Sequence, residues 1–245
     1  MGELANPERR DPEDVKKMFS RVSAHYDKIN RAMCGGLDGI WRGKLARAAV
    51  ENAGAGGKIL DIACGSGDVC AALLARDKTC RVVGADFCAD MLELAKKKCP
   101  DPRAEFVEAD CRHLPFGDSE FNAATISFGF RNFADRAACL AEIARVLKPR
   151  APLCVLEVAR AEGIFAPIQK FFMCNVVPQV ARLFGGVKED YVYLAKTTMD
   201  YPKRDEVEKL FSDAGFEQVA TRTFAFGMVA LTIGLNRSEK PQPNR

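Results

Sequence analysis

Two glycines and an acidic residue have the spacing of a small-molecule site. Gly65 and Gly67 follow an apolar run at 59–62, and Asp86 comes about 20 residues later, at the end of the next apolar run. Glycine at both turn positions permits positive φ angles and close approach of a ligand, while the first N–H groups of a following helix offer donors. An acid at this spacing can accept hydrogen bonds from both hydroxyls of a ribose. The pattern therefore predicts a ligand that contains a nucleoside.

The same turn lacks the features that bind a pyrophosphate. A dinucleotide fingerprint needs a third glycine, but Cys70 stands at that position. Asp68 adds a carboxylate that would repel phosphate groups. S-adenosylmethionine fits these constraints, because it joins an adenosine to a cationic sulfonium and an amino acid and has no phosphate. From the turn alone, glycines used only for packing remain the alternative.

Strands and helices alternate from Lys58 onward. Predicted strands are 59–63, 81–85, 105–108, 123–127 and 153–158; predicted helices are 68–76, 90–98, 136–147 and 205–214; a final hairpin pairs 216–223 with 228–235. Such alternation indicates an α/β fold with a doubly wound, mostly parallel, seven-stranded sheet and an antiparallel last strand. Ligands of these sheets bind at the carboxyl ends of the strands, so the residues just past each strand are the candidates.

Past the third predicted strand stands Asp110-Cys111. Asp110 can accept a hydrogen bond from an adenine amine while the backbone of Cys111 meets a ring nitrogen, or it can cap a helix. His113 follows in a Leu-Pro-Phe context and is interpreted as a loop histidine and not as a catalytic base.

Past the fourth strand, Ser127 begins a segment in which Arg131 and Asn132 lie among phenylalanines. This composition favours contact with a planar, oxygenated substrate ring, and the alternative is that Arg131 pairs with a structural acid. Glu157, at the end of the fifth strand, can be such an ion-pair partner or a site residue.

Before the sheet, Val15, Met18 and Tyr26 recur at helical spacing, and Trp41, Leu45 and Ala49 indicate a second helix. The first helix either packs on the core or closes over the site as a lid. Later in the chain, the apolar segment Gly163–Gly186 predicts either a buried helix pair or an apolar cover for a substrate tail at the membrane surface.

Composition restricts the class of protein. The 245 residues carry a net charge of +3, so nucleic acid is not expected as a partner. The ten cysteines form no Cys-x-x-Cys pair and only two histidines are present, which argues against a metal site or a disulfide framework and for a reducing cytoplasm. The N-terminal residues are not typical of a signal peptide, and no run is long enough to cross a bilayer.

Several motifs together resemble the ubiquinone/menaquinone biosynthesis C-methyltransferases. They are 15–41, Leu60-Asp61-Ile62-Ala63-Cys64-Gly65-Ser66-Gly67-Asp68, Asp86-Phe87-Cys88-Ala89-Asp90-Met91-Leu92, Leu114-Pro115-Phe116, Ser127-Phe128-Gly129-Phe130-Arg131-Asn132, Tyr191-Val192-Tyr193-Leu194, Ala214-Gly215-Phe216 and 227–231. The glycine turn is common to class I methyltransferases, whereas the segment from Ser127 to Asn132 is far more specific.

The resemblance implies S-adenosylmethionine as the cofactor and a lid made by the N-terminal helices. The residues assigned to the cofactor are Asp61, Gly65, Ser66, Gly67, Asp86, Phe87, Asp110, Cys111 and Ser127. Departures from the family pattern include Ser66 in place of threonine, and Asp38 and Thr232 in place of histidines. The lost histidines affect the expected substrate preference.

The reaction implied is methyl transfer to a ring carbon of a polyprenylated quinol, since an oxidised quinone is electron-poor. On this hypothesis Arg131 stabilises the developing phenolate and Asn132 orients the ring. Tyr26 or Asp27 supplies a lid contact or a proton relay. The competing classes are another small-molecule methyltransferase, a nicotinamide-dependent oxidoreductase and a non-catalytic methyltransferase-like subunit.

The predicted organisation is a lid at 1–52, a methyltransferase domain at 53–237 with an apolar helical insertion near 163–198, and a disordered tail at 238–245. Contact with the inner face of the membrane and a homodimer both stay open as partners besides the quinol.

Overall fold

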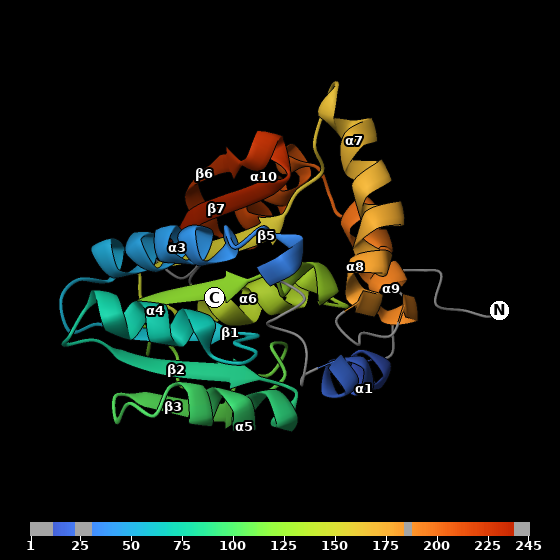
Figure 1. The fold of residues 1–245 in the computed structure, drawn as a ribbon. Helices are drawn as coiled ribbons and strands as arrows, with labels where there is room; N and C mark the ends of the chain where they lie inside the picture. Colours follow the sequence, from blue (N-terminus) through green and yellow to red (C-terminus); the bar gives the residue numbers. More distant parts are fainter. Residues whose placement is uncertain (1–11, 23–30, 184–187, 238–245) are drawn as a thin grey trace.

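A seven-stranded sheet with the order β3-β2-β1-β4-β5-β7-β6 forms the centre of the fold (Figure 1). The computed structural model describes residues 12–22, 31–183 and 188–237. The strands are β1 (Lys58–Ile62), β2 (Arg81–Asp86), β3 (Ala104–Glu108), β4 (Ala123–Ser127), β5 (Pro152–Val158), β6 (Phe216–Phe224) and β7 (Val229–Asn236). The first five are parallel, and β7 runs antiparallel to both β5 and β6. The predicted α/β sheet and its antiparallel last strand are therefore confirmed.

Helices cover both faces of this sheet. On one face lie α3 (Asp38–Ala53), α4 (Asp68–Arg76) and α5 (Ala89–Lys98), and on the other lie α6 (Arg136–Val146) and α10 (Arg204–Asp213). Most predicted elements agree with these bounds to within one or two residues. One placement differs: Trp41, Leu45 and Ala49 of α3 are buried in the core, so this helix belongs to the sheet packing and not to a lid.

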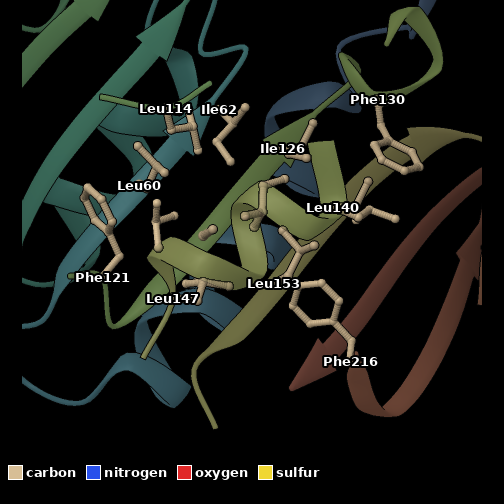
Figure 2. Close-up of a cluster of buried hydrophobic side chains, with 14 of the residues drawn as sticks. Leu60, Ile62, Leu114, Phe121, Ile126, Phe130, Leu140, Leu147, Leu153 and Phe216 are labelled. Carbon is tan, nitrogen blue, oxygen red and sulfur yellow. The ribbon is translucent and has the colours of Figure 1, made fainter. Parts of the chain in front are cut away.

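The core on the α6 and α10 face is built from alternate strand residues and large aromatic side chains. Leu60, Ile126 and Leu153 come from neighbouring strands and pack against residues of α6 (Figure 2). Phe121, just before β4, and Phe216, at the start of β6, lie on opposite sides of this cluster (Figure 2). Each such side chain contributes about 1.5–3 kcal/mol on burial, which fixes the strands whose ends carry the polar candidates.

The strand order reverses between β1 and β4, and a crevice opens at their carboxyl ends. The loop after β1 is tightly turned there: Gly65 has φ 53°, Gly67 has φ 84°, and Ala63 has φ 52°, a left-handed value that is uncommon outside glycine. A Cβ atom on Gly129, in the loop after β4, would lie 2.7 Å from the Cβ of Ala63. Glycine at 129 is thus required for the two loops to meet at the switch point.

After β5 the chain forms an almost continuous helix that stands at one end of the sheet (Figure 1). It comprises α7 (Phe165–Phe171), a π-helical segment (Phe172–Val176) and α8 (Val177–Leu183), and α9 (Lys188–Met199) packs along it. The prediction of a buried helix pair is correct for Met173 and Val177, which are buried against α9, and wrong for α7. Ile168 and Phe171 remain 57% and 64% exposed, because no described element covers that side of α7. Within the described ranges, no helix is long and apolar enough to cross a membrane.

The helix α1 (Pro12–Val22) confirms the predicted amphipathic pattern, with Val15 and Met18 buried. It lies beside α5, where Lys16 pairs with Glu108 at 2.7 Å. Tyr26 and Asp27, the lid candidates, lie outside the described residues, as does the predicted tail.

Candidate active site

A largely apolar cavity occupies the carboxyl ends of β1, β2, β3 and β4. Its polar lining comes from the end of each strand and includes Gly65, Asp86, Asp110 and Ser127, with Asn132 from the short 3₁₀ helix Phe130–Asn132. Phe87 and Cys111 also line it. Seven of the predicted site residues are thereby brought together around one cavity, as the parallel topology requires.

Asp86 joins the glycine turn to the start of α5. One carboxylate oxygen accepts a hydrogen bond from the Gly65 N–H at 2.9 Å, and the other accepts one from the Cys88 N–H at 2.9 Å. Burial raises the pKa of this carboxyl, an effect that the backbone N–H donors oppose. Asp86 therefore holds the turn in place and still borders the cavity.

Asp110 lies in a tight turn at the end of β3. Its carboxylate accepts a hydrogen bond from the Arg112 N–H at 2.9 Å and pairs with the Arg112 guanidinium at 2.6 Å. The bonds from Arg112 hold the pKa of Asp110 below its ordinary value. The helix-cap alternative is wrong, since no helix begins between residues 111 and 122. His113 is exposed and outside the cavity lining, as expected of a loop histidine.

Ser127 and Asn132 present polar atoms that the described part of the chain leaves unsatisfied. The hydroxyl oxygen of Ser127 and both amide atoms of Asn132 are buried and have no hydrogen-bond partner there. A buried polar group without a partner costs about 1–3 kcal/mol. Because both side chains border the same cavity, these atoms are placed to bond a ligand.

Arg131 turns away from this cavity and pairs with Glu157. Its Nη1 lies 2.5 Å from Glu157 Oε1, its backbone N–H donates to Glu157 Oε2 at 3.0 Å, and Nη1 also donates to the Phe128 carbonyl at 2.7 Å. Both side chains are buried. The structure shows the pair with a structural acid, one of the two alternatives for Arg131, and a contact of Arg131 with the substrate stays a prediction.

Three residues assigned to the cofactor lie behind the cavity lining. Asp61 accepts hydrogen bonds from the Thr125 hydroxyl at 2.7 Å and the Cys70 thiol at 3.3 Å, and burial raises its pKa to about 7. The Ser66 hydroxyl accepts a bond from Lys98 at 3.2 Å. A Cβ on Gly67 would lie 3.1 Å from that of Ala95. Their direct contact with the cofactor stays a prediction, while their packing shapes the turn.

Several residues that line the cavity were not identified from the sequence. Val15 closes the cavity from α1, and Phe128 and Met91 form apolar walls. Val15 had been placed on the apolar face of its helix, but nothing in that pattern distinguishes a residue that faces a cavity from one that faces the core.

A second cavity lies beyond the Arg131–Glu157 pair. Its lining includes Glu157, Tyr201, Thr221 and Thr223 and the exposed Arg160 and Arg204. The pair thus stands between a mostly apolar cavity at the switch point and a more polar one under β5, β7 and β6.

Comparison with known proteins decides the family. The family model described as the ubiE/COQ5 methyltransferase family matches residues 6–236. The chain belongs to this family. It is an S-adenosylmethionine-dependent C-methyltransferase, which excludes the oxidoreductase class.

Named relatives agree with this assignment. The chain is 37% identical to a demethylmenaquinone methyltransferase of Thermus thermophilus over 89% of this chain and 99% of that protein. It is 37% identical to one of Corynebacterium kroppenstedtii, over 91% and 94% of the two chains, and 34% identical to one of Staphylococcus saprophyticus, over 91% and 96%.

Solved structures support the fold. A Thermotoga maritima protein described as a possible histamine N-methyltransferase matches with a TM-score of 0.65 and 17% identity, over 90% of this chain and 99% of that one. A putative methyltransferase bound to the Haloferax volcanii Trm112 activator matches with a TM-score of 0.64 and 20% identity, over 89% and 97%.

The cavity suits S-adenosylmethionine on its own chemistry. Asp86 lines the cavity and can accept hydrogen bonds from the ribose hydroxyls. Asp110 and Cys111 lie past β3, at the position expected for the adenine. The Ser127 hydroxyl has no hydrogen-bond partner in the described chain and can bond the ligand. The apolar remainder of the lining excludes water from a cationic sulfonium centre.

Replacement of Asp86, the acid assigned to the ribose, tests the placement of the cofactor in this cavity. We expect Asp86→Ala to weaken S-adenosylhomocysteine binding by about 10²–10⁴-fold, because two hydrogen bonds to a charged acceptor are lost at about 1.5–3 kcal/mol each. Isothermal titration measures the affinity. The matched control is Glu93→Ala, an exposed acid on α5 that pairs with Lys96 and lies outside the cavity. A folded Asp86→Ala protein that binds as tightly as the wild type would contradict the assignment.

Proposed function

We propose that the protein methylates a ring carbon of a polyprenylated quinol in menaquinone or ubiquinone biosynthesis. The three relatives described above, each matched over more than nine-tenths of its length, are named demethylmenaquinone methyltransferases. The observation that carries the proposal is Asn132, whose buried amide offers an unpartnered NH₂ donor group and an unpartnered carbonyl acceptor beside an apolar cavity. A ring that bears hydroxyl groups can satisfy both.

The acceptor is the reduced quinol, because its ring carbon beside a hydroxyl is electron-rich. Bound S-adenosylmethionine supplies an electrophilic methyl group on sulfur. The chain's own contribution is to align the ring carbon with that methyl and to exclude water. Phe128, Phe133 and Leu114 line the cavity and provide apolar surfaces for a planar ring.

For Arg131 we propose a different role from the one expected from the sequence. Its guanidinium is already paired with Glu157, so direct stabilisation of a phenolate would require it to give up part of that pair. We assign Arg131 as a positioning residue that fixes the Phe128–Asn132 loop, and Asn132 as the residue that orients the ring. Tyr26 and Asp27 stay proposed as lid contacts or a proton relay, which agrees with the position of Val15 of α1 on the cavity.

Anaerobic transfer of labelled methyl to short-tailed quinols tests the function. We expect transfer to a reduced demethylnaphthoquinone or a reduced 2-methoxybenzoquinone, with a ring-methylated product, and the ratio identifies the pathway. Asn132→Ala should lower kcat/KM by about 10–100-fold, since one or two ring hydrogen bonds are lost. Asn175→Ala, an exposed amide on the π-helical segment, is the control. S-adenosylhomocysteine binding without transfer to either quinol would refute the substrate class.

We further propose that α7 rests on the membrane that holds the quinol. Ile164, Ile168 and Phe171 follow one another at helical spacing and are 76%, 57% and 64% exposed. Phe226 continues this apolar face: it is 72% exposed, and its ring stacks on that of Phe165 with centroids 4.7 Å apart. Such an apolar face would let a polyprenyl tail stay in lipid while its ring enters the protein.

Co-sedimentation with phospholipid vesicles tests the membrane face. The double variant Ile168→Ser, Phe171→Ser should lower the bound fraction several-fold, because each buried apolar side chain contributes about 1.5–3 kcal/mol. Val192→Ser, on the half-exposed side of α9, serves as the control and should bind as the wild type does. Equal binding of the double variant and the wild type to the vesicles would contradict the proposed membrane contact. The homodimer stays a separate prediction, which sedimentation velocity tests.

A further inference from the structure

The second cavity, beyond the Arg131–Glu157 pair, has no part in the proposed methyl transfer. Its volume is about 490 Å³, and it is bounded by the ends of β5 and β6, the first half of β7 and the start of α10. Pockets of this size commonly hold small molecules. The side chains of Arg160, Arg204 and Phe226 belong to its lining and are exposed, so the cavity opens to solvent.

The inner wall of this cavity offers hydrogen-bonding groups with spare capacity. Tyr201 is 3% exposed, and its hydroxyl bonds no described residue. Burial, together with the charge of Glu157, raises the pKa of Tyr201 well above its ordinary value, so the hydroxyl stays protonated and can donate. Glu157 Oε2 accepts the Arg131 N–H and can accept one bond more. The Thr221 and Thr232 hydroxyls lie 3.0 Å apart and bond each other, which leaves one proton free to donate. The interior therefore suits a ligand that carries hydroxyl groups.

Two arginines give the mouth of the cavity a positive charge. Arg160 forms no ion pair or hydrogen bond with a described residue, and Arg204 pairs loosely with Glu208 at 3.9 Å. The lining also contains the exposed acid Glu162, whereas the carboxylate of Glu157 is already paired. Two positive charges against one negative charge favour an anion at the mouth.

The same mouth borders the exposed apolar face of α7. Phe226 lines the cavity and is 72% exposed, and its ring stacks on that of Phe165 of α7 with centroids 4.7 Å apart (Figure 1). A ligand with its anion at the mouth can therefore lay apolar chains across Phe226 toward Ile164 and Ile168. Hydroxyl groups, an anion and apolar chains are together the parts of a phospholipid with a polyol headgroup.

We propose that the second cavity binds the headgroup of an anionic phospholipid that carries hydroxyl groups, such as phosphatidylglycerol. The phosphate lies between Arg160 and Arg204, the headgroup hydroxyls bond Tyr201 and Glu157, and the acyl chains stay in the membrane beside Phe226. This inference rests on the proposed membrane contact of α7 for the source of the lipid. It does not depend on which quinol is methylated, since the methyl donor is assigned to the other cavity.

Titration with soluble lipid monomers tests the charge of the mouth. Wild-type protein should bind dihexanoyl phosphatidylglycerol, below its micellar concentration, about ten-fold more tightly than dihexanoyl phosphatidylcholine, whose headgroup is neutral overall. The double variant Arg160→Gln, Arg204→Gln should weaken phosphatidylglycerol binding by about 10–30-fold, because each arginine near an anionic headgroup contributes about five-fold.

The matched control for the two arginines is Arg222→Gln. Arg222 is exposed on β6 between two threonines of the lining but is itself outside the lining, so its removal should change the affinity by less than about two-fold. An equal loss in the control and the double variant would overturn the inference. Equal affinity of the wild type for the two lipids would also overturn it.

A second pair of lipids tests the hydroxyl contact. Dihexanoyl phosphatidylmethanol has the charge of phosphatidylglycerol but no hydroxyl in its headgroup. Tyr201→Phe should weaken phosphatidylglycerol binding about five-fold and leave phosphatidylmethanol binding unchanged, because one hydrogen bond is lost with the first lipid alone. Thermal unfolding establishes that the variant folds. Equal effects on both lipids, or an effect on neither, would overturn the inference.

Competition separates a lipid from other occupants of the cavity. Glycerol 3-phosphate should bind far more weakly than the dihexanoyl lipid, and a short-tailed quinol should not displace that lipid. Equally tight binding of glycerol 3-phosphate would make this a site for a soluble phosphate ester, and displacement by the quinol would make it a site for the methyl acceptor. Either result would overturn the inference.

Vesicle co-sedimentation keeps this inference apart from the proposed function. Binding to phosphatidylcholine vesicles that phosphatidylglycerol does not strengthen would refute the headgroup site and leave the membrane contact of α7 in place. Tight binding of monomeric phosphatidylglycerol by a protein that does not sediment with vesicles would refute the contact of α7 alone. Lipid binding without methyl transfer to either quinol would refute the substrate class alone.

Discussion

The buried ion pair between Arg131 and Glu157 is the interaction on which the site depends. It joins the loop after β4 to the end of β5 through both the side chain and the backbone N–H of Arg131. Removing one partner of a buried pair leaves an uncompensated charge, at a cost of about 3–5 kcal/mol. With the loop fixed in this way, Asn132 is held at the cavity with an amide that bonds nothing else in the described chain.

The pair also separates two kinds of environment. On one side lies the cavity at the switch point, with a few polar groups in an apolar lining, and on the other lies the cavity bounded by Tyr201 and the threonines of β6 and β7. A methyl donor with a sulfonium centre and a hydroxylated ring both fit the first environment, because apolar walls exclude water and the few polar groups orient the reactants.

Much of this arrangement follows from the sequence, because parallel strands end at one edge of the sheet. Asp86, Asp110 and Ser127 could be assigned to one cavity on that ground alone, and all three line it. The position of Asp61 behind the cavity lining could not be predicted, because its place in the strand does not reveal that Thr125 and Cys70 donate hydrogen bonds to its carboxylate. The partner of Arg131 lies in the next strand, so local composition could not decide between this ion pair and a substrate contact. The exposure of α7 likewise depends on where neighbouring helices lie, which apolar spacing does not reveal.

The central claim is that the methyl donor binds where the loops after β1, β2, β3 and β4 converge. Hydrogen exchange of the protein with and without S-adenosylhomocysteine tests it most directly. The account predicts slower exchange at 63–67, 86–90, 110–112 and 127–132, and no change at 159–162 and 221–227 around the second cavity. Slower exchange around the second cavity, with none at the glycine turn, would contradict the account.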